Sequence, residues 1–153
     1  MQAPLGADHS PAFGFSPAIA PQLTAQPSSV RPQRVLVLED DALQLELLEA
    51  HLAEVQLQVA TARTVAEARK RLQQERVDLA ILDIQLPDGC GLDLCDAIDA
   101  DPCRRGLPIM VLSSVRERDV IRRTRAAGGA YFLAKPYDPK VLLSLVEALL
   151  SEG

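Results

Sequence analysis

Three short apolar runs in this chain each end in charged residues, and this pattern restricts the possible folds more than any other feature. The runs span 35–38, 79–82 and 131–134, and the charges that follow them are, in order, Glu39-Asp40-Asp41, Asp83 and Lys135. Such runs are typical of strands buried on both faces of a parallel sheet. Because ligands of these sheets bind at the carboxyl ends of the strands, the charges are predicted to converge on one crevice. Carboxylates facing a lysine there favour a divalent cation and a phosphoryl group.

The overall composition bounds the size and class of the protein. With 153 residues, the chain is long enough for one domain with a substantial core and too short for two ordinary ones. Its 48% apolar and 24% charged residues are those of a soluble globular protein. A net charge of −5 gives no general attraction to nucleic acid or to an anionic membrane. No apolar run approaches the roughly 20 residues that span a bilayer, and no secretory signal is recognisable, so we expect no membrane association.

The cysteines favour a reducing compartment. Cys90, Cys95 and Cys103 form no CxxC pair and have no matching histidines, so zinc or a disulfide framework is not expected. A cytoplasmic protein with three small thiols fits this pattern best. A redox role for Cys90, which lies in the segment after Asp83, is the alternative.

Residues 1–33 differ in kind from the rest of the chain. Six prolines lie in this stretch, separated mostly by Ala, Gln and Ser, and only Asp8 and Arg31 are charged. This composition predicts a disordered tail over 1–33 and a folded domain over 34–153. Two alternatives stay open: Phe13 and Phe15 form a short docking motif, or the natural start of the chain lies near Val30.

From Arg34 onward, strand-like and helix-like segments alternate. We predict strands at 34–38, 56–60, 78–82, 108–112 and 130–134. Between them, apolar residues recur at helical spacing, as in Leu45, Leu48 and Leu52. The alternation predicts an open, doubly wound α/β sandwich.

Residues suited to helix ends flank these helical segments. Asp41 and Thr64 stand where N-caps belong, and Glu67, three residues after Thr64, predicts a capping box. The pair Gly128-Gly129 is predicted to end the fourth helix, and Pro139 to begin the fifth.

Four segments within residues 34–151 stand out at the ends of predicted strands, namely VLVLEDD, LAILDIQLPDG, PIMVLSS and YFLAKPYDP. In their order and spacing they resemble the receiver domain of two-component response regulators, the CheY-like family. One such segment alone is weak evidence, but four at predicted strand ends are specific. The resemblance implies a flavodoxin-like fold, with five helices and a five-stranded parallel sheet in the order 2-1-3-4-5.

The resemblance also implies a role for each residue at the strand ends. Asp83 takes the position of the phosphoacceptor, a carboxylate nucleophile that forms an aspartyl phosphate. Asp40, Asp83 and the backbone carbonyl of Gln85 are the implied ligands of Mg²⁺, with Glu39 binding through a water. Lys135 is the implied cation on the other side of the phosphoryl group.

Elementary electrostatics agrees with these assignments. Three carboxylates crowded into one pocket raise one another's pKa unless a cation compensates, and Mg²⁺ prefers oxygen ligands. The alternatives are that the acids are N-caps or solvated loop residues, and that Lys135 is a surface lysine paired with an acid. In the family, the peptide bond between Lys135 and Pro136 is typically cis.

Ser113 and Phe132 occupy the family's switch positions. The Ser113 hydroxyl is implied to bind a phosphoryl oxygen, drawing in the loop after the fourth strand, and the Phe132 ring to turn inward. This change would remodel the face of helix 4, strand 5 and helix 5. Ser114 stands where the family usually has alanine, which would alter the lifetime of the phosphoryl group. Without the resemblance, an aromatic residue on a strand is equally well explained as core.

The fourth helical segment is rich in arginine. It contains five arginines and only two acids, which are Arg116, Arg118, Arg122, Arg123 and Arg125, and Glu117 and Asp119. A solvated or protein-docking face is favoured over nucleic-acid binding, because no DNA-binding helix pair or aromatic stacking platform accompanies it.

These features predict a stand-alone receiver without an output domain. A histidine kinase or histidine phosphotransfer protein would supply the phosphoryl group, and a downstream protein would bind the switched face. We expect the chain not to be an enzyme, but a phosphoacceptor that catalyses its own phosphorylation and dephosphorylation. A phosphohydrolase would need a second carboxylate at the position of Gln85. A pure interaction module would lack at least one of the five site residues, whereas this chain has a chemically competent residue at all five positions. A phosphorelay shuttle, a direct-acting regulator and a piece of a hybrid kinase remain alternatives.

Overall fold

The fold described here is that of a computed structural model, which describes residues 31–114, 118–126 and 130–152. The predicted tail lies outside the described residues up to residue 30. Arg116, Glu117 and the predicted helix stop at Gly128-Gly129 also lie outside them.

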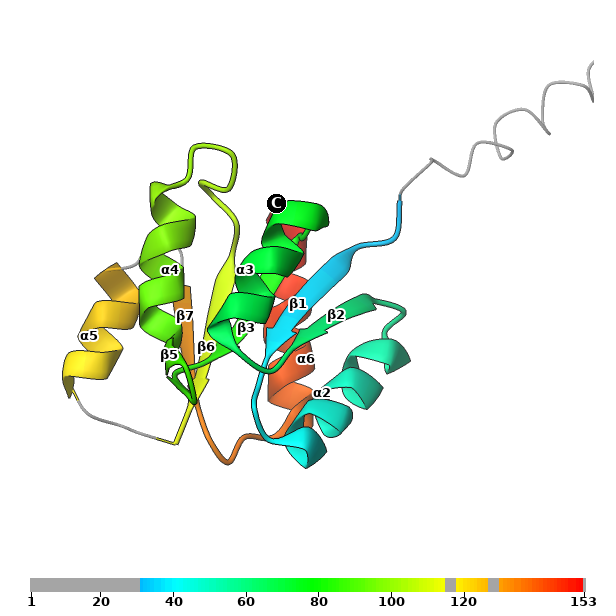
Figure 1. The fold of residues 1–153 in the computed structure, drawn as a ribbon. Helices are drawn as coiled ribbons and strands as arrows, with labels where there is room; N and C mark the ends of the chain where they lie inside the picture. Colours follow the sequence, from blue (N-terminus) through cyan, green and yellow to red (C-terminus); the bar gives the residue numbers. More distant parts are fainter. Residues whose placement is uncertain (1–30, 115–117, 127–129, 153) are drawn as a thin grey trace, which may run out of the picture. The chain divides into compact units, whose positions relative to one another are not determined.

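Five parallel strands form the central sheet and confirm the predicted topology. Their order is β2-β1-β3-β6-β7, which is 2-1-3-4-5 when these five strands are counted along the chain. The strands are β1 (Arg34–Leu38), β2 (Gln58–Ala62), β3 (Leu79–Asp83), β6 (Ile109–Ser113) and β7 (Ala130–Ala134). Figure 1 traces the alternation of strands and helices from β1 in blue to the last helix in red.

The second strand lies two residues later than the predicted range of 56–60. Gln56 has a φ of 62°, a left-handed conformation that belongs to the turn after the preceding helix rather than to a strand. Pairing with β1 then extends the strand at its other end, since Leu38 pairs with Ala62. The bounds of β2 are therefore set by its pairing with β1, which the local apolar pattern does not indicate.

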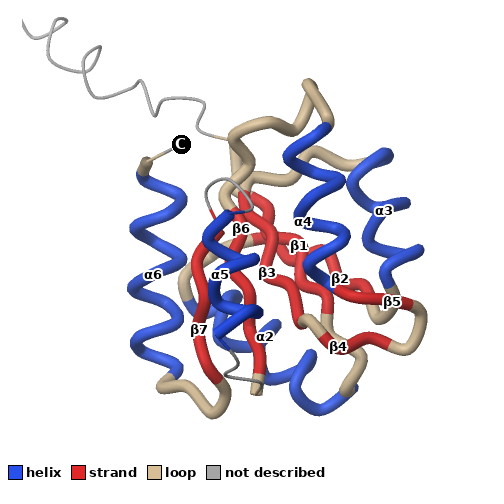
Figure 2. The backbone as a smooth tube through the Cα atoms, turned by 90° about the vertical axis from the view of Figure 1, so that its left-hand side faces the viewer, coloured by secondary structure: helices blue, strands red, loops and turns tan. Residues whose placement is uncertain are grey.

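Five helices within the described residues cover the two faces of the sheet. They are α2 (Ala42–Glu54), α3 (Val65–Gln74), α4 (Gly91–Ala100), α5 (Arg118–Ala126) and α6 (Pro139–Ser151). Residues of α3 and α4 join one buried cluster with alternate residues of the strands, and residues of α2 and α6 join a second. In β3, Ala80 and Leu82 belong to the first cluster, whereas Leu79 and Ile81 belong to the second. The sheet is therefore buried on both faces, and Figure 2 shows its strands between α6 on one side and α3 and α4 on the other.

The predicted helix starts are confirmed. The side chain of Asp41 accepts a hydrogen bond from the backbone N–H of Gln44, and Thr64 accepts one from Glu67. The Glu67 carboxylate accepts from the backbone N–H of Arg63. A capping box uses the N–H of the N-cap residue, here Thr64, so the predicted box forms with its second bond displaced by one residue. The last helix begins at Pro139, and the peptide bond between Lys135 and Pro136 is cis. No helix in the described part of the chain is long and apolar enough to cross a bilayer.

Candidate functional site

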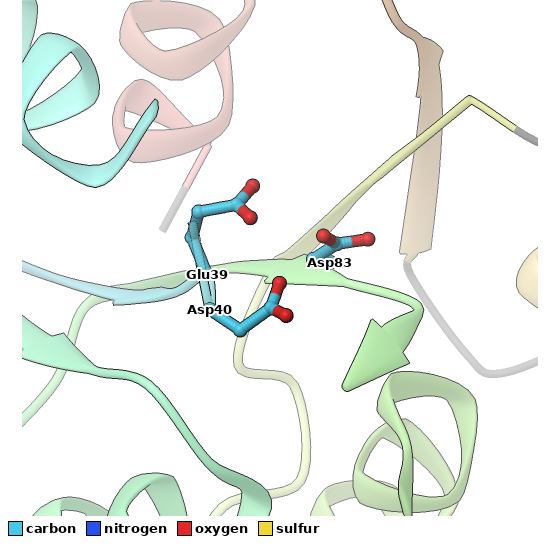
Figure 3. Close-up of side chains that lie close together, drawn as sticks. All are labelled: Glu39, Asp40 and Asp83. Atoms are coloured by element: carbon cyan, nitrogen blue, oxygen red, sulfur yellow. The ribbon is translucent and has the colours of Figure 1, made fainter. Parts of the chain in front are cut away.

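Three carboxyl groups meet at the carboxyl ends of two neighbouring strands. Glu39 and Asp40 directly follow β1, and Asp83 is the last residue of the adjacent β3. One carboxylate oxygen from each of the three lies within 4.8 Å of the others. Figure 3 shows the side chains of Glu39 and Asp40 extending from the end of β1 toward Asp83. The sequence therefore brings its predicted acids together as expected.

The ammonium group of Lys135 reaches this cluster from the end of β7. Its Nζ donates to Glu39 Oε2 at 2.6 Å, to Gln44 Oε1 at 2.8 Å and to Asp83 Oδ2 at 3.3 Å. The side chain of Lys135 is 15% exposed and that of Glu39 is 2% exposed. Since both charged groups are largely removed from water, their pairing is more than a solvated surface ion pair.

The two partners of this ion pair differ in how well the pocket supports their charge. Burial raises the pKa of Glu39, even though hydrogen bonds from Lys135 and from the backbone N–H of Asp41 oppose the rise. For Lys135, burial alone would lower the pKa, but Glu39 and Asp83 together outweigh it and raise the pKa. The pocket therefore favours the charged form of Lys135 and disfavours the charged form of Glu39. Three carboxylates against one ammonium leave a surplus of negative charge.

A short hairpin forms the other side of the site. It consists of β4 (Gln85–Leu86) and β5 (Gly89–Cys90), which pair antiparallel across the turn at Pro87 and Asp88. The backbone N–H of Gln85 lies 3.3 Å from Asp83 Oδ1, so the hairpin starts in contact with the acid cluster. The run Leu86-Pro87-Asp88-Gly89 is typical of a reverse turn, but nothing in the sequence indicates the two paired segments around it.

Asp88, at the turn of the hairpin, connects the site to the start of α3. Its Oδ1 accepts from the backbone N–H of Val65 at 2.8 Å, and its Oδ2 accepts from that of Ala66 at 3.1 Å. These are the first two residues of α3, where backbone N–H groups lack partners within the helix. The hydrogen bond from Val65 is the main cause that lowers the pKa of Asp88.

Comparison with known proteins decides the family. The family model for the response regulator receiver domain matches residues 35–147. The response regulator protein PilR of Pseudomonas aeruginosa is 36% identical over 118 residues, which cover 77% of this chain and 26% of PilR. The transcriptional regulatory protein PdtaR of Mycobacterium tuberculosis is 32% identical over 129 residues, which cover 84% of this chain and 62% of PdtaR. The chain belongs to the response regulator receiver family.

Solved structures agree with this assignment of the receiver. The signal receiver domain of a histidine kinase from Syntrophus aciditrophicus superposes with a TM-score of 0.73 at 32% identity, covering 78% of this chain and 91% of that one. A CheY-like receiver domain protein from Methanospirillum hungatei superposes with a TM-score of 0.75 at 25% identity, covering 80% of this chain and 96% of that one. By contrast, the chain spans only 26% and 62% of the lengths of PilR and PdtaR.

The predicted switch residues lie on the two strands beyond β3. Ser113 is the last residue of β6 and is buried, and the preceding Leu112 pairs with Asp83, so Ser113 lies at the same edge of the receiver's sheet. Its carbonyl oxygen accepts from the backbone N–H of Lys135 at 2.8 Å. Phe132, in β7, is partly buried and packs against the cluster that contains α3 and α4. Ser114 is exposed and lines the cleft over the acid cluster.

Gly91 is a site residue that sequence reasoning missed. It begins α4, and its backbone lies so close to Asp83 that an added Cβ would stand 2.0 Å from the Asp83 carbonyl oxygen. Only glycine fits at this approach without moving the strand end that carries Asp83. The one sequence signal is a glycine in the first position of a helix, which does not by itself name its neighbour.

Gln44 and Arg63 were also missed. Both line the cleft, Gln44 through its bond to Lys135, and Arg63 through a guanidinium whose Nη2 donates to the backbone carbonyl of Asp40 at 2.8 Å. Neither belongs to the motifs that carry the family resemblance, so no local signal separates them from polar residues that only face water.

Proposed function

We propose that this receiver accepts a phosphoryl group on Asp83 from a phosphohistidine of a histidine kinase or phosphotransfer protein. The observation that supports the proposal most strongly is the contact of one ammonium with two of three clustered carboxylates at the strand ends. In the transfer, a carboxylate oxygen of Asp83 forms a bond to phosphorus while the bond between phosphorus and the histidine nitrogen breaks. Lys135 neutralises charge on the transferred group, which is the main form of catalysis open to a phosphoryl acceptor.

The residues present fit Mg²⁺. The surplus of negative charge suits a dication, and carboxylate and carbonyl oxygens are its preferred ligands. Asp40, Asp83 and the backbone carbonyl of Gln85 would hold the ion. Both Glu39 oxygens already accept hydrogen bonds, Oε1 from Asp41 N–H and Oε2 from Lys135, which supports contact through a water. When bound, Mg²⁺ would supply positive charge that, together with Lys135, offsets the negative charge of the transferred group.

The signal would leave the site through Ser113 and Phe132. A phosphoryl oxygen on Asp83 gives the Ser113 hydroxyl a new acceptor at the same sheet edge, and Phe132 lies on the neighbouring strand. The proposed change alters the face formed by α5, β7 and α6, and such coupling is typically worth about 1–3 kcal/mol. We assign this face a protein partner in the cytoplasm. Nucleic acid is disfavoured because the chain carries a net charge of −5.

Mass spectrometry of the intact protein tests the proposal. The receiver is incubated with acetyl phosphate or phosphoramidate and Mg²⁺, and we expect a gain of one phosphoryl group. The gain should disappear in Asp83→Asn and in the presence of EDTA, because the first removes the nucleophile and the second the cation. Asp99→Asn, at an exposed position of α4, is the matched control and should gain the group normally. An unchanged mass of the parent protein would favour an interaction module that never accepts phosphate.

A further inference from the structure

We propose that Gln44 is a positioning residue, whose amide oxygen holds the ammonium group of Lys135 in place for phosphoryl transfer to Asp83. This inference deepens the proposed function and rests on it. Gln44 lies in the first turn of α2, three residues after the VLVLEDD segment and 91 positions before Lys135.

The three hydrogen-bond donors of the Lys135 ammonium match three acceptors. An ammonium carries three N–H donors and no acceptor. Glu39, Gln44 and Asp83 each supply one oxygen, at 2.6, 2.8 and 3.3 Å. A long lysine side chain otherwise samples many rotamers, so contacts from separate elements are needed to fix its end.

The contact with Asp83 is the longest of the three, and this order has a consequence for the reaction. When Asp83 carries a phosphoryl group, Lys135 must donate to an oxygen of that group. The contact with Asp83 is the one to be replaced, whereas Glu39 and Gln44 keep holding the ammonium from the side of β1 and α2. Gln44 thus fixes Nζ in both states without taking part in the bond that forms.

The backbone of Gln44 is itself held in place. Its N–H donates to the N-cap side chain of Asp41 at 3.0 Å, so the first turn of α2 is anchored beside the acid cluster. An amide suits this position because it offers an acceptor oxygen without adding a fourth negative charge to a pocket that already has a surplus. Substituting the side chain leaves the backbone contact with Asp41 intact.

The experiment compares three variants with the parent receiver. Gln44→Met keeps the length and helix propensity of the side chain but removes the acceptor. Gln44→Glu keeps an acceptor oxygen. Glu46→Gln, at an exposed position of the same helix, is the control. One readout is the nitrogen-15 signal of the Lys135 ammonium in the unphosphorylated protein at fixed pH, and the other is the initial rate of phosphorylation by phosphoramidate at saturating Mg²⁺.

We expect Gln44→Met to shift or broaden the Lys135 signal and to slow phosphorylation about 10-fold, as for the loss of a hydrogen bond to a charged group. Gln44→Glu should keep Lys135 hydrogen-bonded and its signal as sharp as in the parent, because the acceptor oxygen remains. Glu46→Gln should match the parent in both readouts. An unchanged signal or an unchanged rate in Gln44→Met would overturn the inference, and so would an equal loss of rate in Glu46→Gln. If the parent itself gains no phosphoryl group, the proposed function fails and the inference fails with it. If only the Gln44 result is negative, the proposed function stands.

Discussion

The two sides of the cleft are held by carboxylates in opposite electrostatic situations. On the side of α2, the buried Glu39 holds Lys135, and burial is the main cause that raises the pKa of this carboxyl. On the side of the hairpin, the exposed Asp88 accepts two backbone N–H groups of α3, and the bond from Val65 is the main cause that lowers its pKa.

The difference separates the part of the site that we propose to be reactive from the part that supports it. A buried carboxylate among other carboxylates holds its charge at a cost, so the α2 side favours binding a further cation. An exposed carboxylate at a helix N-terminus is stable without one, because the helix supplies unpaired N–H groups and a positive dipole end. The α2 side is therefore suited to chemistry, and the hairpin side to fixing the loop that carries Gln85.

Removing the ammonium should break the α2 side and give the largest effect. We expect Lys135→Met to slow phosphorylation by acetyl phosphate about 100-fold or more, the usual cost of losing one charge-stabilising group. The affinity for Mg²⁺ should not fall, because the ammonium that is removed competes with the ion for the same carboxylates. Rates come from intact mass over time, and the Mg²⁺ affinity from titration calorimetry. A variant that phosphorylates at the parental rate would remove Lys135 from the mechanism.

Adding a methyl group at Gly91 tests how tightly the hairpin side is packed against Asp83. The new Cβ of Gly91→Ala would overlap the Asp83 carbonyl oxygen, so the strand end or the helix must move. We expect a loss of about 1–3 kcal/mol in the free energy of unfolding, as for other overpacked sites. Urea unfolding followed by circular dichroism measures it. Gly106→Ala cannot serve as the control for the added methyl group, because the φ of 91° at Gly106 would by itself strain an alanine. Parental stability would show that the close approach relaxes freely.

Removing the two hydrogen bonds between Asp88 and the start of α3 should have a smaller effect, on Mg²⁺ binding rather than on the rate of phosphorylation. We expect Asp88→Ala to weaken Mg²⁺ binding about 10-fold, the low end for residues that support metal ligands, because the Gln85 carbonyl loses its fixed loop. At saturating Mg²⁺, phosphorylation should proceed near the parental rate, in contrast to Lys135→Met. An unchanged Mg²⁺ affinity would contradict a link between the α3 contact and the metal site.

The same residue gives a pH dependence with a definite sign. Because the folded-state pKa of Asp88 lies below the ordinary value of 3.8, its stabilising contribution is present above that value. It is lost as the pH falls through the folded-state pKa. The difference in stability between the parent and Asp88→Ala, measured by urea unfolding, should therefore be full at neutral pH and shrink in strong acid. A constant difference would show that charge on Asp88 does not matter.

Most of the fold, and the group of charges at its edge, could be predicted because both depend on local patterns. Short apolar runs identified the strands, and charges directly after them had to meet at one edge of a parallel sheet. The remainder depends on tertiary contacts. Gln44 and Lys135 are 91 positions apart, and the close approach of Gly91 to Asp83 depends on the path of the hairpin between them. Two-residue strands such as β4 and β5 are too short to show any period.

The proposed role of Asp83 can be tested with a structure of the receiver bound to Mg²⁺ and beryllofluoride, a mimic of the phosphoryl group. We expect the mimic on the carboxylate of Asp83, with Lys135 Nζ and the Ser113 hydroxyl on its fluorides. We also expect Mg²⁺ on Asp40, Asp83 and the Gln85 carbonyl. An unoccupied Asp83 under saturating conditions, or an ion bound away from these three ligands, would refute the proposal.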